Sequence, residues 1–470
     1  MLHVHPHDSS TFASTLALLR NRGETDSAKV EGAVRAILDE VRRDPPSARD
    51  AAVLRFVEQF EKRAVRTLFR TSYDGAAALA RLPADAREAL AYAAARIRRF
   101  HEHEKRAMFP EGGFRFEDDG ATLGLRSRSL DRVGVYAPGG KARYPSSVLM
   151  SAIPAQVAGV REIILATPLS PTPRDASDDM ILAAAHLAGV TAIVDAGGAQ
   201  AIAALAYGTS SVPRVDKIVG PGNAYVACAK RLVYGSVAID SIAGPSELLV
   251  LADSSAEAKI VAADLLSQAE HDEDAYVLLA SESRELVEAV QVELEQQLAS
   301  LPRAVIAREA LRRHGHAFLV SSSTARDGLA DVANVIAAEH LSLQVEDPES
   351  LLALVRHAGA VFVGALTPEA AGDYVAGPSH VLPTGGAVRF GSPLGVHDFI
   401  ARTSVIRYSA DALRRDEKAI CALARLEGLE AHARAVTIRT GSVESVETGS
   451  QHTPLRAGAD GKRLEGESLP

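Results

Sequence analysis

The first hundred residues carry apolar side chains at helical spacing. Over residues 27–65 they recur every three or four positions among Arg and Glu, as at Val34 and Leu38, and predict a helix that is interrupted at Pro45. An Ala- and Arg-rich stretch over 86–103 predicts another helix. These patterns indicate a helical N-terminal region whose apolar faces pack on something larger.

From residue 132 onward, short apolar runs alternate with helical patterns. Such alternation predicts parallel sheets of the doubly wound kind, and its two successive blocks predict two Rossmann-like α/β domains. The predicted strands are 132–136, 162–167, 192–196, 217–219, 247–252, 275–280, 317–320, 360–363 and 435–439. The predicted helices are 146–160, 180–188, one that begins near 202, 256–266, 283–298, one that leads into 338, and 411–433.

Composition and charge narrow the class of protein. Of the 470 residues, 47% are hydrophobic and 24% are charged, which is typical of a globular protein, and the net charge of −9 does not indicate nucleic-acid binding. Two cysteines, Cys228 and Cys421, exclude a Cys-based zinc site. Neither a signal peptide nor a membrane span is predicted, so we expect a cytoplasmic protein. The histidines of residues 1–7 are interpreted as an incidental, flexible cluster.

Glycine turns follow several of the predicted strands. Gly220-Pro221-Gly222-Asn223 begins like a dinucleotide fingerprint but lacks its third glycine, so a standard Rossmann cofactor motif is not supported. Glycines where strands end still indicate a ligand crevice at that edge of the sheet. A structural turn is the competing interpretation.

One stretch combines a predicted helix with ligand-type residues. Gln268 and His271 stand three positions apart and would share a face if the helix continues. Imidazole is a common zinc ligand, whereas solvation at a helix end is the plainer interpretation of both residues. Ser246 comes at the start of a predicted strand, where a turn or capping role is the simpler interpretation.

Three more clusters hold acid, base or ligand groups. Glu339 and His340 place a carboxylate beside an imidazole after an apolar helix, and could act as an acid/base pair. Asp373 lies in a Gly/Pro-rich loop, where it is either a metal ligand or part of an Asx turn. Glu427 and His432, five apart, would not share a face of one straight helix, and either could simply be solvated.

In chain order, from about residue 25 to residue 440, these stretches resemble the histidinol dehydrogenase family. The number of ordered matches makes the resemblance specific, and it favours the functional interpretation of each cluster. The matching runs are 135–140, 144–150, 197–205, 220–223, 243–247, Ser267-Gln268-Ala269-Glu270-His271, Ala338-Glu339-His340-Leu341, 380–384, and Glu427-Gly428-Leu429 followed by His432.

The resemblance implies an NAD-dependent, four-electron oxidation of L-histidinol to L-histidine by way of the aldehyde. His340 would be the base and Glu339 would activate water. One zinc ion per subunit is implied at Gln268, His271, Asp373 and His432. Substrate contacts are implied for these four residues and for Ser246, His340 and Glu427. NAD contacts are implied for Tyr136, Gln200 and Asn223.

The resemblance also implies a division of the chain and a homodimer with shared active sites. Residues 25–134 and 242–395 would form the domain with the zinc and substrate residues, and 135–241 the NAD-binding domain. Residues 1–24 would be an N-terminal segment and 396–440 a small C-terminal arm. The polar stretch 441–470 is expected to be a disordered tail.

Two rival functions are compatible with the same residues. One is a paralogous dehydrogenase that oxidises another small alcohol, such as a sulfonated propanediol. Glu427 and His432 together favour the imidazole-bearing substrate. The other rival is a non-catalytic zinc and nucleotide-binding protein, which would have no need of the pair Glu339 and His340. Departures from the family pattern at Lys141, Arg143 and Ser379 fall outside the expected ligand positions.

Overall fold

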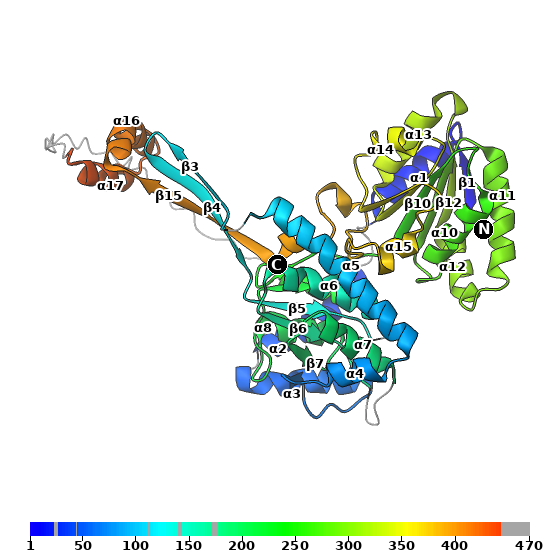
Figure 1. The fold of residues 1–470 in the computed structure, drawn as a ribbon, viewed down its shortest axis with the longest axis horizontal. Helices are drawn as coiled ribbons and strands as arrows, with labels where there is room; N and C mark the ends of the chain where they lie inside the picture. The colour runs from blue at the N-terminus through cyan, green and yellow to red at the C-terminus, as the bar shows by residue number, and fades with distance from the viewer. Residues whose placement is uncertain (23–26, 44, 111, 140–142, 171–175, 443–470) are drawn as a thin grey trace, which may run out of the picture. The chain divides into compact units, whose positions relative to one another are not determined.

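The computed structural model describes residues 1–22, 27–43, 45–110, 112–139, 143–170 and 176–442 (Figure 1). The chain divides into two compact units. The first comprises Met1–Gly113 and Ser127–Thr403, and the second comprises Phe114–Arg126 and the described residues from Ser404 onward. Both predicted doubly wound sheets lie in the first unit.

One sheet is six-stranded within the described residues, with the order β2-β7-β6-β5-β8-β9. Its strands are parallel except for β2, which pairs with β7 in the antiparallel sense. The short apolar runs form these strands because both faces are covered by helices. The strands are β2 (Phe69–Arg70), β5 (Arg132–Tyr136), β6 (Glu162–Ala166), β7 (Ala192–Val194), β8 (Lys217–Val219) and β9 (Ala238–Ile239).

Helices cover the two faces of this β5 sheet in separate apolar cores. On one face lie α2 (Ser27–Arg43), α3 (Pro46–Phe56), α8 (Gly198–Tyr207) and α9 (Ala224–Val233), with the π-helical turn Val57–Glu61 following α3. On the other lie α4 (Gly75–Arg81), α5 (Ala84–Met108), α6 (Pro145–Ala158) and α7 (Ala176–Leu187). Helices α2, α3 and α5, which were expected to belong to the zinc-side domain, therefore pack on the sheet of β5.

The second sheet is parallel throughout its described strands, with the order β1-β12-β11-β10-β13-β14. Its first strand corrects the interpretation of the histidines at the N-terminus as flexible, because His3 and His5 belong to a strand paired with β12. The strands are β1 (His3–Pro6), β10 (Glu247–Ala252), β11 (Tyr276–Ser281), β12 (Gly315–Leu319), β13 (His340–Gln344) and β14 (Ala360–Val363).

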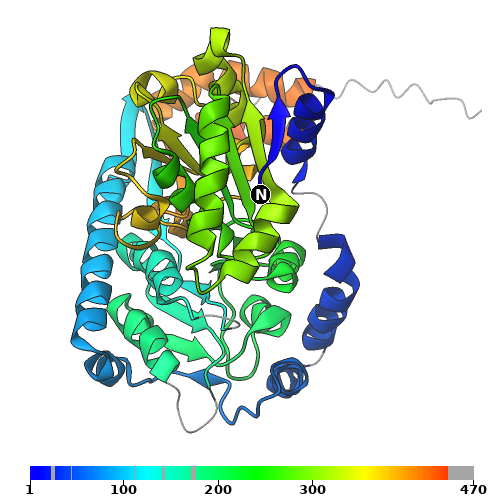
Figure 2. The same ribbon diagram turned by 90° about the vertical axis from the view of Figure 1, so that its right-hand side faces the viewer.

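Two layers of helices enclose this β10 sheet. Helices α10 (Ala258–Ala269), α11 (Arg284–Leu298) and α12 (Ala304–His314) pack on one face, which is turned toward the viewer in Figure 2. Helices α1 (Ser10–Arg20), α13 (Ala325–Ile336) and α14 (Pro348–Leu352) pack on the other. A short helix, α15 (Glu369–Tyr374), follows β14 and packs against α10.

The second unit contains a β-hairpin and a helical pair. The strand order is β15-β4-β3, formed by β3 (Phe114–Asp118), β4 (Ala121–Ser129) and β15 (Ile400–Tyr408). Helices α16 (Ala410–Leu426) and α17 (Glu430–Thr440) pack against each other. The predicted single helix over 411–433 is wrong, because Gly428 adopts a φ of 74° and breaks it. The predicted strand 435–439 is also wrong, since it lies within α17.

Among the described residues, no helix combines the length and apolar character needed to cross a membrane. The predicted tail falls outside the described residues except for Gly441 and Ser442. Arg143, one of the departures from the family pattern, has a structural role, because its guanidinium donates to Asp178 at 3.0 Å. Ser379, another departure, donates its hydroxyl to the backbone carbonyl of Met150 at 3.1 Å.

Candidate active site

The end of α10 supplies the first candidate ligand. Gln268 is fully buried, and neither its amide oxygen nor its amide nitrogen has a hydrogen-bond partner among the described residues. The helix ends at Ala269, so it does not continue to His271, and the condition on which Gln268 and His271 would share a helix face is not met. The His271 side chain is 39% exposed. A fully buried amide without a partner indicates a ligand-binding position, because such burial is otherwise costly.

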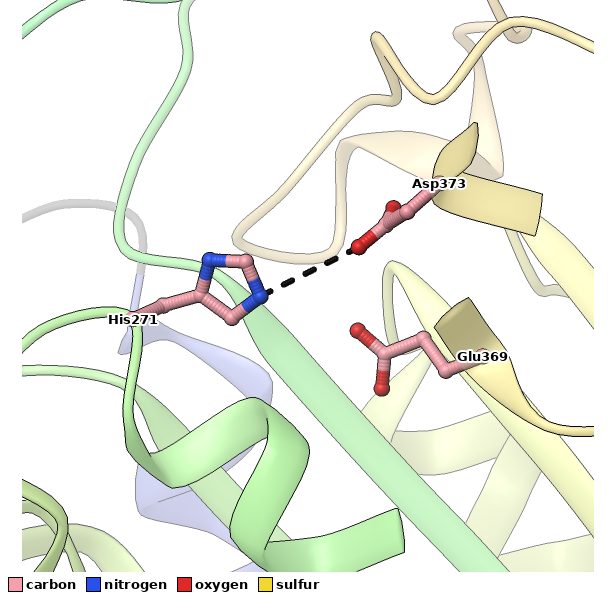
Figure 3. Close-up of side chains that lie close together, drawn as sticks. All are labelled: His271, Glu369 and Asp373. Atoms are coloured by element: carbon pink, nitrogen blue, oxygen red, sulfur yellow. Dashed lines mark ion pairs between the residues drawn. The ribbon is translucent and has the colours of Figure 1, made fainter. Parts of the chain in front are cut away.

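Helix α15 brings two carboxylates to the same place. Asp373 was predicted to lie in a loop, which is wrong, because it belongs to α15. Glu369 and Asp373 lie one helical turn apart on one face of this helix. A ring nitrogen of His271 and one carboxylate oxygen from each of these residues lie within 4.8 Å of one another. The His271 Nε2 atom is 3.9 Å from Asp373 Oδ2, and the three side chains point toward one another (Figure 3). Burial raises the pKa of Asp373, and the charge of His271 opposes this.

The donor set fits a divalent metal. Imidazole nitrogen and carboxylate oxygen are established zinc ligands. The unpartnered amide of Gln268 adds an uncharged oxygen donor on α10, which packs against α15. Glu369 was not among the predicted site residues. Its signal was the four-residue spacing from Asp373, which becomes informative only once a helix is predicted there.

The sharp turn from α13 into β13 places Glu339 and His340. Ala337 ends the helix in the left-handed region, with φ 52° and ψ 61°, an uncommon conformation for a residue other than glycine. His340 then begins β13 and pairs with Leu248 on one side and Ala360 on the other. The Nδ1 atom of His340 is 3.4 Å from Glu369 Oε1. Burial lowers the pKa of His340 to about 3, with smaller contributions from the charges of neighbouring histidines.

A buried ion pair holds the backbone around Glu339. The Glu247 carboxylate pairs with Arg22, whose side chain is 2% exposed, and accepts the backbone N–H of Glu339 at 3.1 Å and that of Gly385 at 2.8 Å. In return, Glu339 Oε2 accepts the backbone N–H of Glu247 at 3.0 Å. Burial, followed by the charge of Glu247, raises the pKa of Glu339 well above its usual value. The carboxylate is therefore a stronger base than a solvated one.

His380 connects this cluster to the other sheet. Its Nδ1 atom lies 3.1 Å from the backbone carbonyl of Asp373, and its Nε2 atom lies 3.3 Å from the hydroxyl of Ser147 on α6. Burial lowers the pKa of His380 to about 4. His380 belongs to one of the runs that match the family, but no role was predicted for it.

A small cavity of about 60 Å³ lies between the β5 sheet and the β10 sheet. Ser246 and Glu339 line it from the β10 side, and Gly220 and Pro221 line it from the β5 side. Lys230, fully buried, pairs with Asp240 beside it and donates to the Gly220 carbonyl at 2.9 Å. A larger, open hollow of about 600 Å³ at residues 214–216 and 234–238 contains none of the candidate residues.

The three expected NAD contacts lie at the carboxyl ends of strands or on the helices that follow. Tyr136 ends β5, and its hydroxyl accepts the Gly198 N–H at 3.0 Å. Gln200, in the first turn of α8, donates to Glu61 at 3.1 Å. Asn223 caps α9, and its side chain accepts the backbone N–H groups of two residues of that helix at 3.1 and 3.2 Å. In the β10 sheet, by contrast, Ser246 and His340 lie at the amino ends of strands.

The remaining predicted residues lie in the second unit. Glu427 is the C-cap of α16 and His432 lies in the first turn of α17, and both are exposed. Three of the four predicted metal residues, Gln268, His271 and Asp373, are therefore in the first unit and the fourth is in the second.

The chain is similar to known histidinol dehydrogenases. A family model described as histidinol dehydrogenase matches residues 20–440. The histidinol dehydrogenase of Syntrophotalea carbinolica is 49% identical over 441 residues, covering 93% of this chain and 99% of that protein. The one from Lactiplantibacillus plantarum is 48% identical, covering 87% and 93%. The solved structure of histidinol dehydrogenase from Elizabethkingia anophelis matches with a TM-score of 0.85 and 33% identity, covering 94% of this chain and 98% of that chain.

Proposed function

The chain belongs to the histidinol dehydrogenase family, and on that premise we propose that Gln268, His271 and Asp373 bind one zinc ion per subunit. The reaction is that of the family, an NAD-dependent oxidation of L-histidinol to L-histidine in histidine biosynthesis. We also propose that the protein is cytoplasmic.

The metal proposal is supported by the donor set and by the unpartnered amide of Gln268. Gln268, His271 and Asp373 would hold the zinc ion, which would supply a fixed positive charge that orients the substrate. Ser246, which lines the cavity beside Glu339, contacts the substrate from the β10 side. His432 and Glu427 complete the metal and substrate positions from a second copy of the chain in a homodimer.

His340 is proposed as the base for the alcohol step. Its lowered pKa keeps the imidazole neutral at physiological pH, and the neutral form is the one that accepts the hydroxyl proton as hydride leaves for NAD. Glu339 is proposed as the base that activates water for hydration of the aldehyde. Its raised pKa and its place in the cavity wall suit that task.

NAD is proposed to bind at the carboxyl edge of the β5 sheet. Ligands of doubly wound sheets bind at this edge, and Tyr136, Gln200 and Asn223 all lie there. The cavity between Gly220 and Ser246 then lies between the cofactor side and the substrate side. The observation that carries the whole proposal is the acid/base pair beside a metal-type donor cluster, in a chain of this family.

The experiment separates the two half-reactions. Glu339→Gln keeps the shape of the side chain but removes the base for hydration, so it should slow histidinal oxidation at least about tenfold more than histidinol oxidation. His340→Asn should slow the alcohol step by about 100-fold or more. Single-turnover NADH formation from each substrate measures both effects. Equal slowing of the two steps by Glu339→Gln would refute the water-activating role.

A further inference from the structure

Glu369 is the carboxylate closest to the imidazole of His340. Its Oε1 atom lies 3.4 Å from Nδ1, and both side chains are almost fully buried, at 2% and 6% exposure. The other carboxylate near Nδ1 belongs to Glu339, at 3.9 Å, but that oxygen already accepts the backbone N–H of Glu247. Glu369 is therefore the better-placed acceptor for a proton on Nδ1.

Both groups have buried polar atoms that need partners. His340 Nδ1 and Glu369 Oε2 form no hydrogen bond with any described group, and buried atoms of this kind are rarely left unpaired. Hydrogen bonds at catalytic sites are often long without substrate and shorten in the reacting complex. A slight approach of Glu369 to Nδ1 turns the present 3.4 Å separation into a hydrogen bond at the usual distance.

We propose that Glu369 is a positioning residue for His340, accepting a hydrogen bond from Nδ1–H and so leaving Nε2 as the basic nitrogen. The inference rests on the proposed role of His340 as the base. In the alcohol step the substrate hydroxyl proton moves to Nε2, while Nδ1 keeps its proton. Burial raises the pKa of Glu369 well above its usual value in the resting site, and the positive charge of the imidazolium that forms at His340 opposes this and favours the charged carboxylate beside it.

The competing role is that of a metal ligand, because a Glu369 oxygen lies within 4.8 Å of the ligand atoms of His271 and Asp373. The two roles predict different measurements. Replacing a positioning residue changes which nitrogen of His340 is protonated and leaves zinc bound. Replacing a metal ligand changes the zinc content.

The test uses Glu369→Leu, which removes both oxygens at similar volume, and Glu369→Gln, which keeps one acceptor oxygen. ¹⁵N NMR of the imidazole nitrogens, with the His340 signal assigned by its loss in His340→Asn, reports the tautomer. We expect Glu369→Leu to lose the Nδ1-protonated signature, to lower kcat about 10- to 100-fold and to change KM less than about threefold. Glu369→Gln should lie between it and the wild type, and both should retain the wild-type zinc content.

A double variant and a matched control complete the experiment. If Glu369 acts through His340, His340→Asn with Glu369→Leu should turn over within about twofold of His340→Asn alone. Asp264→Asn alters another buried carboxyl group, one that accepts from Gln344 at 2.7 Å, and should leave the His340 signature in place. Zinc loss in Glu369→Leu, an unchanged tautomer, or further slowing in the double variant would each overturn the proposal. Wild-type turnover in His340→Asn would instead refute the base on which the inference rests.

Discussion

At the scale of single residues, the sequence predicts which residues belong to the site better than it predicts their burial and their partners. The resemblance picks out Gln268, His271 and His340, but nothing in the sequence shows that the Gln268 amide is buried without partners. Glu369 is missed because no motif includes it, although it approaches both the donor cluster and His340. Burial and pairing depend on contacts between β13, α10 and α15, and these segments are far apart in sequence.

Gln268→Leu tests the metal site directly. The substitution keeps an apolar side chain of similar volume and removes both amide atoms, so folding should be preserved while zinc affinity falls about 100-fold or more. Zinc content by elemental analysis and competition with a chromogenic chelator measure the change. The control Gln297→Leu makes the same substitution in α11, where the amide donates to the Lys259 carbonyl. Equal zinc affinity in the two variants would exclude Gln268 as a ligand.

At the scale of elements, long periodic segments are predicted well and short ones are not. Helix α15 has six residues, contains Gly372 and lies in a Gly/Pro-rich stretch, so its helical form depends on packing rather than on propensity. The break between α16 and α17 is concealed because apolar residues continue at helical spacing on both sides of Gly428. The strand β1 is short and rich in histidine, so its own sequence does not indicate a strand. It is a strand because it pairs with β12.

The contacts of Glu104 on α5 should stabilise the fold to a degree that depends on pH. It accepts hydrogen bonds from the Val396 N–H at 3.1 Å and has both His101 Nδ1, at 2.7 Å, and His397 Nδ1, at 3.2 Å, beside it. Burial alone would raise the pKa of Glu104, but hydrogen bonds to the two histidines and to the Val396 backbone outweigh it and lower the pKa to about 2. The hydrogen bond to Glu104 raises the pKa of His397.

The sign of each shift defines a pH window. The lowered carboxyl pKa stabilises the fold above the usual value of 4.5 and loses this effect as the pH falls toward 2. The raised pKa of His397 stabilises the fold below pH 6.5, the usual imidazole value. This stabilisation is lost as the pH rises through the pKa of His397 in the folded protein. Glu104→Gln should therefore lower the melting temperature more at pH 5.5 than at pH 8, by about 2–4 °C for a screened contact of about 1 kcal/mol. The control is Glu102→Gln, at an exposed position of the same helix. An equal loss of melting temperature at both pH values in Glu104→Gln would contradict a pH-dependent stabilisation by Glu104.

At the scale of the whole molecule, the alternation of strands and helices predicts both parallel sheets. It does not predict which sheet edges meet. Tyr136 and Asn223 lie at the carboxyl side of the β5 sheet, whereas Ser246 and His340 lie at the amino ends of strands in the β10 sheet. The arrangement depends on packing of residues 381–399, which follow the β10 sheet in the chain and enter the core of the β5 sheet. No local sequence signal specifies such a contact.

The second unit gives the homodimer its clearest test. Helix α16 exposes Leu423 at 62% and Leu426 at 84%, near Glu427, and apolar side chains exposed together are typical of a surface that another chain covers. If His432 completes the site of a partner, a two-fold dimer holds two equivalent shared sites. The variants His340→Asn and His432→Asn are each inactive under this arrangement, since each removes one group from both sites.

Mixing the two variants separates the alternatives. After unfolding and refolding together, random pairing makes about half of the dimers mixed, and each mixed dimer has one site with both defects and one with neither, so about a quarter of wild-type activity should return. If each site is built within one chain, every site in a mixed dimer carries a defect and activity stays at background. Differently tagged chains, purified through both tags, establish that the dimers are mixed. Background activity in those dimers would exclude a site shared between subunits.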